Sequence, residues 1–225
     1  MQFGLMEMVA AMGPVAKIVS VILLAMSIIS VYMLIERQLV FAQARKKSFE
    51  VAPKLAGLLK SGNVKDALAL SNKKDYKGSH LARITSAGIQ AFIEGKEAKL
   101  GFDQQIETAV RGSERAQVLF NQELRRGLNV LATIATSAPF IGLFGTIFGI
   151  INAFRGMQLT GSGGIGAVAG GISEALVTTA VGIGVAVLAL WCFSMLNSKI
   201  EIYDAEMSNT SSQVVDFFIK SGEAR

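Results

Sequence analysis

Three long stretches of the chain carry no charged residue. Residues 18–35, 127–154 and 175–198 hold 18, 28 and 24 uncharged residues in turn, most of them apolar. A helix needs about 20 predominantly apolar residues to cross a hydrocarbon core of about 30 Å. The pattern therefore predicts three transmembrane helices, over residues 15–35, 131–154 and 173–196.

The segments around the predicted spans differ from one another in composition. Residues 1–14 are short and apolar, and we expect them to lie as an amphipathic segment at the outer surface. Residues 36–130 are rich in charge and form a predicted helical domain on the opposite side. Residues 155–172 form a Gly-rich outer link, and residues 197–225 continue the third span as a C-terminal helix.

Apolar residues within the charged domain recur at steps of three and four, which is typical of helices. The segments SGN at 61–63 and YKGSH at 76–80 mark turns, and Ser79 is a candidate cap for the helix that follows. From Glu97 onward one apolar face continues into the second span, which predicts an uninterrupted helix. The residues expected to pack the tail against this domain are Ile200, Ile202, Tyr203, Val214, Phe217 and Phe218.

The predicted class is an all-α membrane protein with three transmembrane helices, the second and third extended into a cytoplasmic helical bundle.

Composition and charge agree with a membrane protein and orient it. The chain is 51% hydrophobic and 17% charged, which is too apolar for an ordinary soluble domain. Residues 37–129 hold 17 of the 22 Lys and Arg, whereas residues 156–173 hold none. Basic residues stay on the cytoplasmic side, so the domain and the C-terminus are expected inside and the N-terminus outside. The net charge of +5 is then explained by this topology and by phospholipid contact, and a nucleic-acid partner is not required.

The first apolar run has a signal peptide as its alternative interpretation. Lys17 precedes the run, as in a signal peptide, but the run is longer than a usual signal core. It ends in LIERQLVFAQARKK, which has no small-residue cleavage pattern. A retained helix is the favoured prediction.

The sequence contains few residues of the types that carry covalent catalysis. Cys192 and His80 are each the only residue of their kind; we expect the first to be a small apolar filler and the second a solvated side chain. The segment GSGGIG at 161–166 matches a dinucleotide-binding pattern, but that pattern requires a preceding strand, and a membrane helix is predicted there. We expect no enzyme activity, no catalytic residue, no cofactor and no metal.

Small residues gather in the second and third predicted spans. They let membrane helices approach closely, where packing drives association. Ordinary helix packing accounts for most of them. Pro139 also frees backbone carbonyls one turn earlier in the second span. The candidate packing positions are Pro139, Gly142, Gly145, Gly149 and Gly182.

A few polar residues interrupt these apolar spans. Glu174 and Thr178 share a face of the third span at positions i and i+4. A charged group at the bilayer midplane costs about 2.5–3.5 kcal/mol on insertion scales, so one that persists suggests a function. By residue counting alone, Glu174 is either an interfacial carboxylate or a pore residue. On the second span, a weakly polar stripe is predicted from Asn129, Thr133, Thr136 and Thr146.

Two long motifs carry a resemblance to a known family. They are LATIATSAPFIGLFGTIFGIINAF at 131–154 and AGGISEALVTTAVGIGVAVLAL at 169–190. Together with the opening GPVAKIVSVILLAMSIISVYMLIERQLVF and the basic domain between them, they resemble the MotA/TolQ/ExbB proton-channel family, in its TolQ/ExbB branch. The resemblance spans nearly the whole chain. The flagellar branch of the family has four spans and a different loop, so the resemblance argues against a role in flagellar rotation.

The resemblance implies a stator subunit in the bacterial inner membrane, driven by the proton motive force. It implies a ring of five chains around two copies of a single-span ExbD/TolR-like partner with a membrane Asp, and a TonB/TolA-like or gliding effector beyond them. By motif position, Thr146 and Thr179 correspond to channel threonines and Glu174 to the family's acidic residue, with Thr178 beside them. The machine that is driven, the choice between proton and sodium, and the type of motion stay open. The alternative function is a passive membrane scaffold that conducts no ions.

Overall fold

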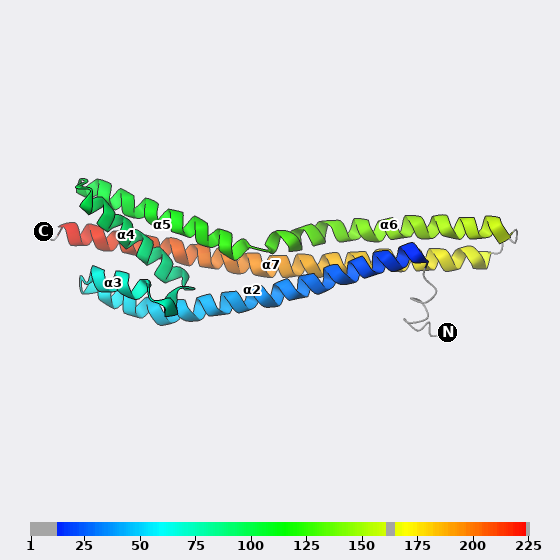
Figure 1. Ribbon diagram of the computed structural model, residues 1–225, viewed down its shortest axis with the longest axis horizontal. Helices are drawn as coiled ribbons and strands as arrows, with labels where there is room; N and C mark the ends of the chain where they lie inside the picture. The colour runs from blue at the N-terminus through cyan, green and yellow to red at the C-terminus, as the bar shows by residue number, and fades with distance from the viewer. Residues whose placement is uncertain (1–12, 161–164, 224–225) are drawn as a thin grey trace. The chain divides into compact units, whose positions relative to one another are not determined.

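The computed structural model describes residues 13–160 and 165–223, and these are almost entirely helical (Figure 1). The predicted amphipathic segment before residue 13, and residues 161–164 of the Gly-rich link, lie outside the described residues. No strand occurs in the part of the chain that is described, and the predicted all-α class is confirmed. The elements in chain order are α2 (Pro14–Lys60), α3 (Val64–Ser71), the 3₁₀ helix η1 (Lys74–Tyr76), α4 (His80–Glu97), α5 (Phe102–Arg125), α6 (Leu128–Thr160) and α7 (Ile165–Glu223).

Three helices are long and apolar enough to cross a membrane. The candidate segments are Pro14–Lys60, Leu128–Gln158 and Val168–Ser221, and each contains one of the three predicted spans. Large apolar side chains on α2 point away from the chain: Val21 is 65% exposed and Leu24 is 61% exposed. Such a surface is unfavourable in water and suits a lipid environment.

The chain divides into two compact units. The first, here called the apolar unit, comprises the described residues up to Ile35 together with Gly127–Met195. Its core brings together side chains of α2, α6 and α7, so each apolar helix buries one face against the other two. The buried residues of this core are Val19, Leu23, Ile134, Ala138, Val185, Ala186 and Ala189.

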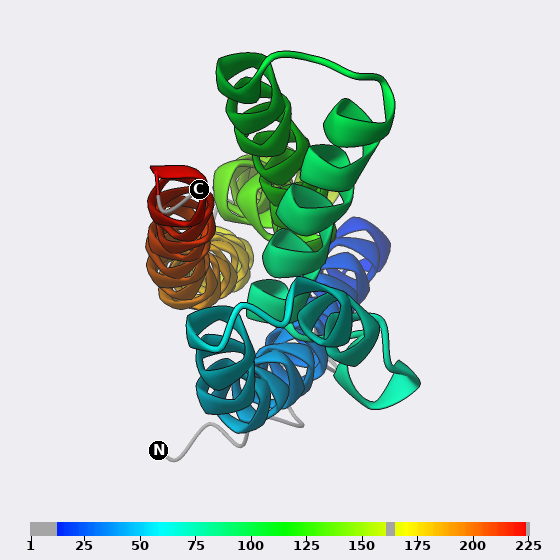
Figure 2. The ribbon, with the colours of Figure 1, turned by 90° about the vertical axis from the view of Figure 1, so that its left-hand side faces the viewer.

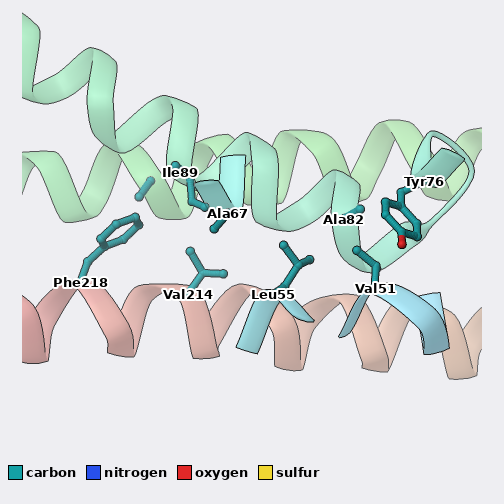
Figure 3. Packing of buried hydrophobic residues seen from close by; sticks show 9 residues of the cluster. Val51, Leu55, Ala67, Tyr76, Ala82, Ile89, Val214 and Phe218 are labelled. Carbon is teal, nitrogen blue, oxygen red and sulfur yellow. The ribbon is translucent and has the colours of Figure 1, made fainter. Parts of the chain in front are cut away.

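The second unit, here called the polar unit, comprises Glu36–Arg126 and Leu196–Arg225. It contains α3, α4 and α5 beside the second halves of α2 and α7, as the end-on view shows (Figure 2). In its core, Val214 and Phe218 project from α7 toward Ile89 of α4, and Leu55 of α2 lies beside them (Figure 3). The ring of Phe218 stacks on Phe92, with centroids 3.9 Å apart. The unit is thus tied together by residues far apart in sequence.

Two predicted features of the polar unit are confirmed. The turn at residues 61–63 separates α2 from α3, with Gly62 at a φ of +77°. Ser79 caps α4, because its hydroxyl accepts a hydrogen bond from the Ala82 N–H over 3.1 Å. A helix N-terminus has unpaired N–H groups, and a serine oxygen at this position satisfies one of them.

The predicted continuous helix from residue 97 into the second span is wrong. The chain breaks after α4, restarts as α5 at Phe102, and breaks again between α5 and α6. At the second break Gly127 has a φ of +85°, a left-handed conformation that glycine adopts without steric cost. A single glycine leaves the spacing of the apolar residues around it unchanged. The periodic pattern therefore did not indicate the break at Gly127.

The predicted packing of the C-terminal segment holds for most of its residues. Ile200, Val214 and Phe218 are buried in the polar unit, and Phe217 packs against its core. Ile202 is the exception, since 58% of it is exposed. Tyr203, next to it, is buried, so the helix turns Ile202 outward.

Candidate functional site

A seam of small residues joins α6 to α7 inside the apolar unit. A Cβ atom added to Gly182 would lie 2.7 Å from the Ala138 carbonyl oxygen, and one added to Gly142 would lie 2.9 Å from the Thr178 carbonyl oxygen. Real Cβ atoms do not approach a backbone oxygen so closely. The two helices therefore pack backbone to backbone, which is how membrane helices gain contact energy.

The seam continues toward the start of α7. At Gly145, an added Cβ would lie 2.9 Å from the Thr178 hydroxyl oxygen, and at Gly149 it would lie 2.9 Å from the Ala175 Cβ. All four predicted packing glycines thus lie in the seam. Pro139 is half-buried within α6.

The three candidate channel threonines differ in whether their hydroxyls are hydrogen-bonded. The hydroxyl of Thr146 donates to the Leu143 carbonyl oxygen over 2.6 Å, and that of Thr178 donates to the Ala175 carbonyl oxygen over 2.7 Å. These bonds stay within one helix and are common for membrane threonines. The Thr179 hydroxyl is buried and has no hydrogen-bond partner among the described residues. A buried hydroxyl without a hydrogen bond destabilises the fold. Of the three hydroxyls, that of Thr179 would therefore gain most from a hydrogen-bond partner outside the described chain.

Glu174 has a partner that the sequence did not reveal. Its Oε1 accepts a hydrogen bond of 2.7 Å from the N–H of Gly13, the residue just before α2. The Glu174 carboxylate on α7 therefore caps the N-terminus of α2, where the helix dipole favours a negative charge. A cavity of about 220 Å³ beside it is lined by residues of all three apolar helices, among them Asn152 and Gly171.

The predicted polar stripe on α6 is not a single surface. Thr133 and Thr136 are exposed, and each hydroxyl donates to a carbonyl oxygen of its own helix. Thr146, in contrast, is buried. The structure therefore separates the stripe into an outward-facing part and a buried part near the glycine seam.

A second polar site, in the polar unit, was missed from the sequence. His80 is fully buried, although we expected it to be solvated. Its Nδ1 lies 3.0 Å from the Ser48 hydroxyl oxygen and its Nε2 lies 2.6 Å from Oε2 of Glu206. The Ser48 hydroxyl also lies 2.8 Å from that of Ser79, and the Tyr203 ring lies 4.9 Å from the imidazole. The histidine thereby connects α2, α4 and α7.

The environment of this histidine shows its role. Burial lowers the pKa of His80 below its usual value of 6.5, and the hydrogen bond to Glu206 offsets only part of that effect. Ser48, His80 and Glu206 have the order of a hydrolase triad, but the Ser48 hydroxyl is buried and shared with Ser79. A nucleophile needs access to a substrate, so the cluster is a structural link between helices.

The three apolar helices, the glycine seam and the capped carboxylate define a multi-span helical membrane protein. A family model described as the MotA/TolQ/ExbB proton channel family matches residues 78–209, more than half of the chain. The chain belongs to this family, in its TolQ/ExbB branch, and with its three apolar helices it is a bacterial inner-membrane protein.

Curated relatives show how far this similarity extends. The chain is 34% identical over 161 residues to the biopolymer transport protein ExbB of Pseudomonas putida, which covers 72% of the chain and 48% of that relative. The chain thus spans about half the length of this relative. It is 31% identical over 202 residues to the Tol-Pal system protein TolQ of Haemophilus influenzae, covering 87% of the chain and 85% of the relative. A biopolymer transport protein ExbB of Neisseria meningitidis is 31% identical over 198 residues, covering 86% of the chain and 87% of the relative.

Proposed function

We propose that the chain is a proton-conducting stator subunit that converts the proton motive force into mechanical work in the cell envelope. It would act with an ExbD/TolR-like single-span partner, as two copies inside a ring of five of these chains. Relatives named for biopolymer transport and for the Tol-Pal system support work of the Ton or Tol type. In this arrangement the N-terminus is periplasmic and the C-terminus cytoplasmic.

The observation that carries the proposal is the buried hydroxyl of Thr179 beside the glycine seam. This oxygen has no partner in the described chain, whereas the other two candidate threonines are satisfied within their helices. A water molecule or a partner carboxyl group reaching it would remove the cost of the unpaired hydroxyl. A proton pathway along the seam requires a hydroxyl that can form hydrogen bonds with water or with a partner carboxyl group in this way.

The passive scaffold is the second candidate, and specific observations favour it as well. Glu174 caps a helix, and the hydroxyls of Thr146 and Thr178 bond to their own backbones. Contacts of this kind stabilise the fold, and they do not require the protein to conduct protons. The two functions differ in a measurable quantity, which is the proton flux through the complex.

Two substitutions of Glu174 separate its charge from its capping bond. Glu174→Gln keeps a carbonyl oxygen that accepts from the Gly13 N–H but removes the titratable group. Glu174→Ala removes both. In vesicles that contain the complex, we expect Glu174→Gln to melt close to the wild-type temperature, because only the interaction of the charge with the helix dipole is lost, and to lower proton flux at least tenfold.

The alanine variant is the matched comparison. We expect it to lose flux and, in addition, about 1 kcal/mol of stability with the lost cap. Wild-type flux for Glu174→Gln, combined with reduced stability for Glu174→Ala, would limit Glu174 to the structural role and favour the scaffold.

A further inference from the structure

A cavity of about 530 Å³ lies in the polar unit between α2 and α7. Its wall is held in place by contacts between these helices. The Tyr203 hydroxyl donates to the Phe41 carbonyl oxygen over 3.0 Å, and the two rings meet edge to face with centroids 5.7 Å apart. Lys199 donates to the side-chain oxygen of Gln38 at one end of the cavity. The cavity therefore has a defined shape.

Positive charge dominates the lining. Arg45, Lys46 and Lys199 contribute three cationic groups, and Glu206 is the one lining carboxylate. Neither Arg45 nor Lys46 forms an ion pair with any residue that the structure describes. The Glu206 carboxylate is engaged by His80 Nε2 at 2.6 Å, so part of its hydrogen-bonding capacity is already used. The cavity is suited to an anion.

Apolar side chains accompany these cations. Phe49 is 75% exposed and Ile202 is 58% exposed, and both line the cavity. Leu39, which is 61% exposed, lies on α2 between the first predicted span and Arg45. Exposed apolar side chains beside a cationic cluster match a molecule with a hydrophobic chain and an anionic head.

The sequence position of the cavity narrows the class of ligand further. The first lining residue on α2, Gln38, comes three residues after the predicted end of the first span at residue 35. The first lining residue on α7, Lys199, comes three residues after the predicted end of the third span at residue 196. Basic cavities between helices at this level are where anionic lipid headgroups bind. We infer that this cavity holds the phosphate headgroup of an anionic phospholipid, with Arg45, Lys46 and Lys199 around the phosphate. This site goes beyond the proposed conduction function and does not depend on it.

Native mass spectrometry of the purified full chain, titrated with dioleoyl phosphatidylglycerol or dioleoyl phosphatidylcholine, tests this inference. We expect one phosphatidylglycerol per chain, retained at least tenfold more strongly than phosphatidylcholine. The double substitution Arg45→Gln/Lys46→Gln should remove that preference, because each basic group near a phosphate adds to the affinity. The matched control is Lys73→Gln/Lys74→Gln, which removes the same charge from exposed positions outside the cavity and should keep the preference.

Four results would overturn the inference. The first is equal retention of the two lipids by the wild type. The second is an equal loss of preference in the control and cavity variants, which would mean that overall charge is responsible. The third is an unchanged lipid preference in Arg45→Gln/Lys46→Gln with an altered number of chains per complex, which would make the cavity an interface between copies. Displacement of the lipid by inorganic phosphate alone would assign the site to free phosphate.

Discussion

Gly182→Val is expected to destabilise the apolar unit strongly, whereas Gly184→Val on the same helix is not. An added Cβ at Gly182 meets the Ala138 carbonyl oxygen at 2.7 Å, while one at Gly184 meets nothing within 4 Å. Overpacking of this kind costs about 1–3 kcal/mol, and here the obstacle is backbone, which cannot rotate away. Since both positions are helical glycines, the difference between the variants isolates the packing of the seam.

The single cysteine provides the measurement for this pair. Cys192 is buried in α7, so its thiol reacts with a maleimide dye only when the helices open during heating. Gly182→Val should unfold at a temperature several degrees lower than Gly184→Val in the same detergent. Gly170, also without neighbours within 4 Å, offers a second control position on the same helix. Identical unfolding temperatures for the two valine variants would mean that α6 and α7 do not pack at this distance.

His80→Ala is expected to lower the free energy of unfolding by about 3 kcal/mol or more. The substitution leaves a cavity beside Tyr203, removes one of the two hydrogen-bond partners of the Ser48 hydroxyl and removes the imidazole partner of Glu206. Thermal or urea unfolding of the full chain in detergent measures the loss. Lys65→Ala, at an exposed position of α3, is the control and should change stability by less than about 0.5 kcal/mol.

The same histidine should make stability depend on pH. Because burial holds the pKa of folded His80 below 6.5, the unfolded chain binds more protons than the folded chain between pH 6.5 and that lowered pKa. The contribution is therefore fully present above pH 6.5 and is lost as the pH falls through the window. Glu206 of α7 is the charged group bonded to the ring, while α2 presents the neutral Ser48 and α5 the ring of Phe120. His80→Gln, which does not titrate, should lack this part of the pH dependence; the same slope in both proteins would contradict it.

The spans and the glycine seam were predictable because local sequence determines both. A charge-free run of 18 or more residues indicates a helix in lipid whatever lies beside it. Glycines spaced by three and four, such as Gly142, Gly145 and Gly149, must share a helix face, and a face without side chains invites close packing. These predictions required no knowledge of which residues meet across the fold.

The polar contacts that span long stretches of sequence could not be predicted in this way. Ser48 and Glu206 lie 32 and 126 residues from His80, and no periodic pattern links the three. The bond between Gly13 and Glu174 joins residues 161 apart, and counting residues left the depth of Glu174 open. Spacing along one helix shows which side chains share a face. It does not show which face meets another helix.

The most direct test of proton conduction compares Thr179→Val with Thr133→Val. Each substitution exchanges a hydroxyl for a methyl group, but the Thr179 hydroxyl is buried without a partner whereas the Thr133 hydroxyl bonds to its own helix on an exposed face. The complex with the proposed single-span partner is reconstituted into vesicles. Proton entry is followed with a pH-sensitive dye under an imposed membrane potential, with an uncoupler to define full equilibration. We expect Thr179→Val to reduce flux at least tenfold and Thr133→Val to leave it within about twofold of the wild type. Unchanged flux in Thr179→Val, or a wild-type flux no greater than that of protein-free vesicles, would contradict the account.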